Sequence, residues 1–137
     1  MKLGEIVSIV EGRLISRRAD LDMEILRAGA ADLMSDVLAF ADPGSILLTG
    51  LCNPQVIRTA EMADIAGIVF VRGKYPPPET IILAEEKGMP LVVAPHTMFE
   101  LCGRLYQAGL QSCDISDRNY VRADLKGSVD GAGGDTR

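Results

Sequence analysis

The chain has 137 residues and a formal net charge of −5, and 47% of its residues are hydrophobic. This size and apolar content fit one globular domain of the usual length of roughly 150 residues, and they exclude a chain that is disordered throughout. The acidic balance excludes nucleic acid or an anionic membrane as the main partner, because both need a basic face.

The first forty residues predict two helices and two short strands. Apolar residues at helical spacing predict a helix over residues 3–10, and Gly12 is expected to end it. Residues 13–15 and 24–29 are expected to form short strands. A second helix is predicted over residues 32–40, with Asp32 as its N-cap.

Three strand–helix units follow in succession. Near-continuous apolar runs predict buried parallel strands at 45–49, 68–71 and 91–94. Helices are predicted after them at 53–62, 76–87 and 98–108, with Asn53 and Thr97 as N-caps and Gly88 as a stop. The short loops imply right-handed crossovers, so the fold class is α/β: a single compact domain with a mostly parallel sheet, helices packed on it, and a short N-terminal helix and strand.

The apolar periodicity fades from Gln111 onward. We expect residues 1–112 to form the domain and residues 113–137 to be a C-terminal extension, Gly-rich and disordered from about residue 127.

The cysteines and the absence of a long apolar run indicate the cellular compartment. No apolar stretch approaches the roughly 18 residues of a membrane-spanning helix, and the N-terminus carries no export signal. Cys52, Cys102 and Cys113 form no CxxC pair, so we expect reduced thiols, no metal site and a cytoplasmic location.

Ligands of open parallel sheets bind beyond the carboxyl ends of the strands, where helix N-termini present unpaired amides. Three loops of this chain take such positions, at 48–54, 71–76 and 94–97. Glycines there would let a ligand approach the backbone, and two cations would attract an anion. We therefore expect a site for a small anion, made by Thr49, Gly50, Cys52, Asn53, Arg72, Gly73, Lys74, His96 and Thr97. The structural alternative is that the glycines end strands and the cations are solvated loop charges.

His96 and Cys52 offer chemistry as well as binding. His96 is the single histidine of the chain, so any acid–base chemistry of a histidine must use it; the alternative is a partly exposed loop residue. Cys52 lies at a strand end beside a predicted helix N-terminus, which would stabilise its thiolate and suggests redox sensing; the alternative is a small residue that fits the turn.

Several catalytic signatures are missing. The sequence contains no GxxxxGK[ST], GxGxxG, HExxH or GxSxG motif. We therefore expect no cofactor, no metal and no set of catalytic residues, and a kinase or hydrolase would lack the residues that it needs.

From Met1 to about Leu110 the chain resembles the DRTGG domain family. The likeness rests on the order of its segments: GAADLMSD from Gly29 to Asp36, then LLTGLCNP, IVFVRGK followed by PPPETI, AEEKGMPLVV and TMFELCGRLYQAGL. The resemblance implies a compact regulatory α/β domain that self-associates, is found beside CBS domains in some pyrophosphatases, and is similar in fold to the N-terminal domain of HPr kinase/phosphorylase. The chain departs from the naming motif, since Leu51-Cys52 follows Thr49-Gly50 where an Asp-Arg pair often stands, and Arg72-Gly73-Lys74 replaces Thr-Gly-Gly.

Two functions from different classes fit these observations. The first is a non-enzymatic regulatory or assembly module, a homodimer or a subunit that docks on a partner enzyme, which senses a small anionic metabolite such as an adenine nucleotide. The alternative is a small enzyme that acts on a phosphorylated or carboxylated metabolite, with His96 as acid–base and with Arg72 and Lys74 as an anion clamp.

Overall fold

A computed structural model describes residues 1–113, and the strands of this part form one sheet in the order β1-β5-β4-β3-β2-β6. β1 pairs antiparallel with β5, and every other neighbouring pair is parallel. The α/β class and the mostly parallel sheet are thereby confirmed. The strands are β1 (Arg13–Leu14), β2 (Arg27–Ala30), β3 (Ile46–Thr49), β4 (Gly67–Phe70), β5 (Leu91–Val93) and β6 (Gln111–Ser112).

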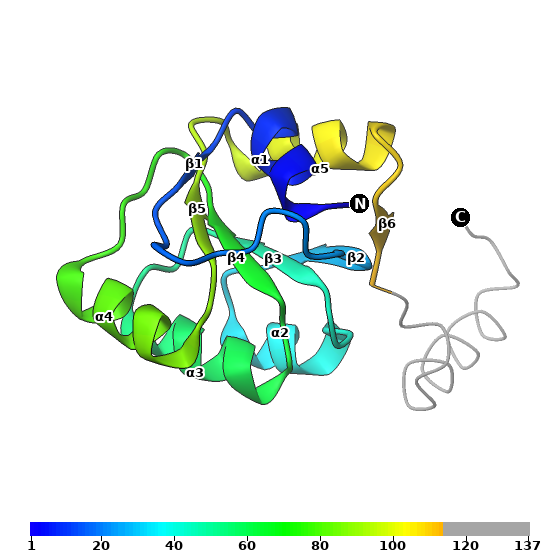
Figure 1. Cartoon of the computed structure of the whole chain (residues 1–137). Helices are drawn as coiled ribbons and strands as arrows, with labels where there is room; N and C mark the ends of the chain where they lie inside the picture. The colour runs from blue at the N-terminus through cyan, green and yellow to red at the C-terminus, as the bar shows by residue number, and fades with distance from the viewer. Residues whose placement is uncertain (114–137) are drawn as a thin grey trace, which may run out of the picture.

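Helices cover both faces of the sheet (Figure 1). Strands β2 to β5 are neighbours in chain order, so right-handed crossovers place α2, α3 and α4 on one face. The chain returns through α5 to β6 at the far side of β2, and α5 therefore lies with α1 on the opposite face. The helices are α1 (Leu3–Ile9), α2 (Met34–Phe40), α3 (Pro54–Met62), α4 (Pro78–Lys87) and α5 (Met98–Gln107).

The central strands are buried on both faces because their side chains alternate between two cores. Leu48 and Val69 pack toward α1 and α5, whereas Leu47 and Ile68 pack toward α2, α3 and α4. This double burial explains why the strands have near-continuous apolar runs rather than alternating ones.

Most of the predicted end signals are confirmed. The Asn53 side chain accepts a hydrogen bond from the N–H of Gln55 at 3.1 Å and caps α3, and the Thr97 hydroxyl accepts one from the N–H of Glu100 at 3.3 Å at the start of α5. Gly88 ends α4 in the left-handed conformation, with φ of 67°.

Three local predictions are corrected by the structure. The strand predicted over 24–29 begins at Arg27. Asp32 is not the cap of α2, because the helix begins at Met34 and Leu33 occupies the cap position. The Asp32 side chain instead accepts a hydrogen bond from the N–H of Gly50. Strand β6 was not expected, since Gln111 and Ser112 are polar and exposed and join the sheet through their backbone.

No helix among residues 1–113 is long and apolar enough to cross a membrane. All of the predicted C-terminal extension (residues 113–137) except Cys113 lies outside the described residues, including the disorder expected from about residue 127.

Candidate functional site

The ends of β2 and β3 are joined by the carboxylate of Asp32. Its Oδ1 accepts hydrogen bonds from the N–H of Gly50 at 2.7 Å and from the hydroxyl of Thr49 at 3.1 Å. The Thr49 hydroxyl in turn accepts one from the N–H of Leu51 at 3.1 Å. β2 and β3 are parallel neighbours, so their carboxyl ends meet at one edge of the sheet. Asp32 therefore belongs with the predicted site residues Thr49 and Gly50, although sequence analysis assigned it to a helix cap.

Arg72 reaches this cluster from the loop after β4. A Cβ atom added to Gly50 would lie 3.2 Å from the guanidinium Nη2 of Arg72 and 3.5 Å from Oδ1 of Asp32. The Arg72 guanidinium and the Asp32 carboxylate therefore both lie directly beside the Gly50 backbone. The structure thus brings Thr49, Gly50, Asp32 and Arg72 together at the carboxyl edge.

The turn after β4 takes an unusual backbone path. Arg72 and Gly73 both have positive φ, 58° and 67°. This path directs the N–H of Arg72 to the carbonyl of His96 at 2.8 Å and the N–H of Gly73 to the carbonyl of Ala94 at 2.7 Å. A non-glycine residue in this conformation is uncommon, and in the described part of the chain Glu11 and Asp64 share it with Arg72.

The loops after β4 and β5 lead to helices on opposite faces of the sheet (Figure 1). Such a divergence of connections is where open α/β sheets bind ligands. Here the two backbone hydrogen bonds of Arg72 and Gly73 hold the loops against each other, while the side chains of Arg72 and Lys74 stay exposed. The exposed charged groups of the cluster at this edge are therefore Arg72, Lys74 and Asp32.

Cys52 lies half-buried beside the same loops. Burial raises the pKa of its thiol, and the charges of Lys74 and Arg72 oppose that rise while Asp32 adds to it. These interactions place Cys52 among the charged groups of the cluster. Burial of Cys52 therefore disfavours the thiolate that the strand-end position suggested, whereas the two nearby cations favour it.

The loop that carries Cys52 is anchored from α4. The hydroxyl of the buried Thr80 donates a hydrogen bond to the carbonyl of Cys52 at 2.7 Å. The side chain of Asn53, the next residue, is used as the cap of α3. Thr80 thus holds the Cys52 backbone in position, and the Asn53 side chain is occupied by its hydrogen bond with Gln55.

His96 and Thr97 direct their side chains to other partners. His96 Nε2 lies 2.7 Å from Oε1 of Glu11, which also faces Arg104 Nη1 at 3.4 Å. The hydrogen bond from His96 and the charge of Arg104 lower the pKa of the Glu11 carboxyl. Thr97 caps α5. The contact of His96 with the turn at Arg72 is made by its backbone carbonyl, which accepts the N–H of Arg72.

The cluster holds two cations, Arg72 and Lys74, and one carboxylate, that of Asp32. Within residues 1–113, neither Arg72 nor Lys74 takes part in an ion pair. The same part of the chain holds no group of three or more His, Cys, Asp or Glu residues that could bind a metal ion. Two exposed cations therefore lie on the loop after β4, close to the Gly50 backbone.

Comparisons with known proteins bear on the fold of this chain. No protein-family profile and no curated protein matches the chain. Among solved structures, it is similar to the CBS and DRTGG domains of the regulatory region of Clostridium perfringens pyrophosphatase, in complex with the activator diadenosine tetraphosphate. The TM-score is 0.60 and the identity 14%, over 94% of this chain and 59% of that chain. At this identity the likeness concerns the fold, which is DRTGG-like.

Proposed function

We propose that this protein is a regulatory module that senses a small anionic metabolite, with adenine nucleotides as the ligand class. The ligand's phosphates would lie at the carboxyl edge of the sheet, against Arg72 and Lys74 and the backbone at Gly50 and Gly73. The remaining predicted residues would shape the site through the loops that they hold: Thr49, Cys52, Asn53, His96 and Thr97.

One observation carries this proposal. Arg72 and Lys74 are exposed cations without ion-pair partners among the described residues, in a chain whose net charge is −5. Both lie on the turn where the connections to opposite faces diverge. Unpaired cations at a strand end attract phosphate groups, and guanidinium groups bind them through paired hydrogen bonds. The nucleotide bound by the structurally similar pyrophosphatase region supports adenine nucleotides as the first compounds to test.

We also propose that the module self-associates or docks on a partner enzyme. The layer formed by α2, α3 and α4 exposes large apolar side chains, among them Leu38, Met62 and Ile82. Each of the three helices contributes one of these side chains, and apolar surface that is contiguous across neighbouring helices is typical of interaction surfaces. A second copy of the chain is the partner that we test first. The three free thiols support action in a reducing cytoplasm.

The binding test uses calorimetric titration of the full chain with ATP, AMP and diadenosine tetraphosphate. We expect Arg72→Ala/Lys74→Ala to weaken binding at least about tenfold, because two charge-assisted contacts are lost. Arg17→Ala/Arg18→Ala is the matched control, since it removes two exposed cations beside Glu85 and Glu86 of α4, away from the carboxyl ends of the strands. Equal weakening in both variants, or no binding to the unaltered protein, would refute the proposed site.

A second experiment separates sensing from catalysis and measures self-association. His96→Ala is expected to leave nucleotide affinity and oligomeric state unchanged. If the unaltered protein converts a metabolite and His96→Ala does not, the enzymatic alternative is favoured. Native mass spectrometry is expected to show a species at twice 14.7 kDa. Met62→Lys/Ile82→Lys should convert it to monomer, while Leu21→Lys, at an exposed leucine outside the helical layer, should not.

A further inference from the structure

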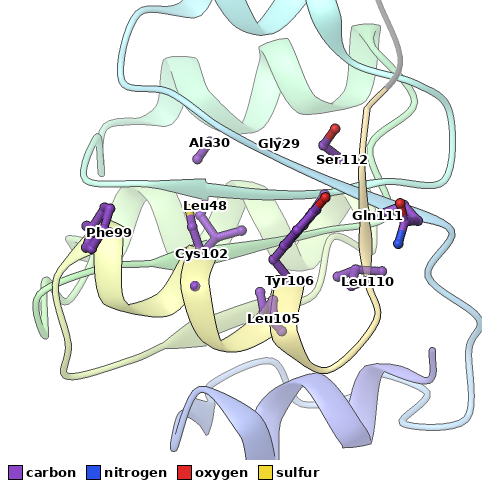
Figure 2. A pocket seen from close by; sticks show the side chains of 12 residues that line it. Gly29, Ala30, Leu48, Phe99, Cys102, Leu105, Tyr106, Leu110, Gln111 and Ser112 are labelled. Atoms are coloured by element: carbon purple, nitrogen blue, oxygen red, sulfur yellow. The ribbon is translucent and has the colours of Figure 1, made fainter.

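An apolar groove lies on the face of the sheet that α1 and α5 cover. It runs between α5 and the side of the sheet formed by β2 and β6 (Figure 2). Its volume is about 360 Å³. The small side chains of Ala28 and Ala30 leave this part of the sheet thinly covered, and Leu48 and Cys102 contribute to the lining. The groove is thus distinct from the charged carboxyl edge, and its chemistry is apolar.

Two aromatic residues of α5 remain uncovered at this groove. Phe99 is 90% exposed and Tyr106 is 65% exposed. Both line the groove, and Figure 2 shows them on α5 beside Cys102. Large exposed aromatic side chains beside an apolar depression favour an occupant that removes them from water.

The chain itself supplies a segment at the rim of the groove. Gln111 and Ser112 of β6 belong to the lining, and the N–H of Cys113 donates a hydrogen bond to the carbonyl of Ala28 at 2.9 Å. The described chain therefore ends against β2, and the following residues start beside the groove. Apolar residues occur early in that segment, at Ile115, Tyr120, Val121 and Leu125.

The distance and the tether both favour this segment over a separate partner. Tyr120 lies seven positions after Cys113, and an extended chain of that length spans at most roughly 23 Å. The ten residues of α5 are only roughly 15 Å long, so Tyr120 can reach any part of the groove. A short tether also gives an effective concentration on the order of millimolar, far above that of a second copy in dilute solution.

We propose that this groove is the docking site for the segment that follows Cys113, with Tyr120 and Val121 as the side chains that fill it. The segment covers Phe99, Tyr106 and the thiol of Cys102 when it is docked. This inference does not depend on nucleotide binding at the carboxyl edge.

The reactivity of Cys102 reports on occupation of the groove. Full-length protein is treated with iodoacetamide, and the alkylation rate of each cysteine is measured by peptide mass mapping. Cys52 serves as an internal control, because it is also half-buried but lies at the charged edge. We expect Tyr120→Ser/Val121→Ser to raise the rate at Cys102 at least about fivefold and to leave Cys52 unchanged. Asp117→Ser/Arg118→Ser, a polar pair in the same segment, should change neither rate.

Four results would overturn the proposal. The first is an equal Cys102 rate in the unaltered protein and in the Tyr120/Val121 variant. The second is an increase of the same size in the polar control pair. The third is a parallel increase at Cys52, which would mean general loosening of the fold. The fourth is protection of Cys102 that grows with protein concentration, which would make a second copy the occupant.

Discussion

The Oδ1 atom of Asp32 lies 2.7 Å from the backbone nitrogen of Gly50, so one carboxylate joins the ends of two neighbouring parallel strands. The same oxygen accepts the hydroxyl of the buried Thr49. This contact fixes the loop over which the Arg72 guanidinium lies. Asp32 therefore has two effects: it orders the loop, and it places a negative charge beside the proposed anion site.

Substitution of Asp32 separates these two effects. Asp32→Ala leaves the N–H of Gly50 without its acceptor, and we expect a loss of roughly 1–2 kcal/mol in the free energy of unfolding. Asp32→Asn keeps a carbonyl oxygen as acceptor, so its loss of stability should be smaller. It also removes a negative charge beside Arg72, so nucleotide affinity should rise. Urea unfolding and calorimetric titration measure both, and equal destabilisation by Asn and Ala would contradict the assignment of Oδ1 as the ordering atom.

The central strands and their helices could be predicted because their signals are local. The apolar runs of β3, β4 and β5 need only burial on both faces, and Asn53 and Gly88 act on residues next to them in the chain. The three strand-end loops were therefore placed correctly at one edge of the sheet.

The contacts of Asp32 could not be predicted from its neighbours in the sequence. An aspartate before an apolar helical pattern is typical of an N-cap, yet its partners Thr49 and Gly50 follow 17 and 18 residues later. Those partners depend on the pairing of β2 with β3, and β2 has a weak signal because Arg27–Ala30 contains only small or charged residues. β6 was missed for a related reason, since its two polar residues are held by backbone pairing alone.

Gly29 is predicted to be intolerant of any side chain. A Cβ atom at this position would overlap the ring of Phe40, which ends α2. We expect Gly29→Ala to reduce the free energy of unfolding by roughly 1–3 kcal/mol, as overpacking commonly does. Gly103→Ala is the matched control, because nothing lies within 4 Å of its Cβ position and alanine favours the helix by about 0.5–1 kcal/mol. Chemical denaturation of both variants tests this. Phe40→Leu should partly rescue Gly29→Ala, and absence of rescue would argue against the ring as the obstacle.

Thr80 is predicted to stabilise the Cys52 loop through its hydroxyl. The side chain is fully buried, and its Oγ1 donates to the carbonyl of Cys52 at 2.7 Å. Thr80→Val keeps the shape but removes the donor, and we expect a loss of roughly 1–2 kcal/mol in the free energy of unfolding because the Cys52 carbonyl is left unpaired. Thr80→Ser keeps the donor. The backbone amides of residues 50–53 should therefore exchange with solvent more slowly in Thr80→Ser than in Thr80→Val. Hydrogen exchange that is equally fast in the two variants would show that packing, not the hydrogen bond, orders the loop.

Glu11 is predicted to give the protein part of its stability at neutral pH. The hydrogen bond from His96 and the charge of Arg104 lower the pKa of the Glu11 carboxyl in the folded state. A carboxylate with a lowered folded-state pKa contributes stability above its unfolded pKa, and this contribution is lost as the pH falls through the folded value. Glu11→Gln should therefore be less stable than the unaltered protein near pH 7, and the difference should shrink well below the ordinary glutamate pKa of about 4.3.

Urea unfolding midpoints of both proteins across this pH range measure the effect. Glu86→Gln is the control, since Glu86 is an exposed glutamate of α4, outside the His96 and Arg104 cluster. It should lose stability on acidification in parallel with the unaltered protein. His96→Ala should raise the pKa of the Glu11 carboxyl toward its ordinary value, as followed by carboxyl-carbon NMR, because the hydrogen bond that most lowers it is gone. If the stability of Glu11→Gln and of the unaltered protein falls in parallel with pH, the contact between Glu11 Oε1 and His96 Nε2 contributes nothing to folding, although the two atoms are 2.7 Å apart.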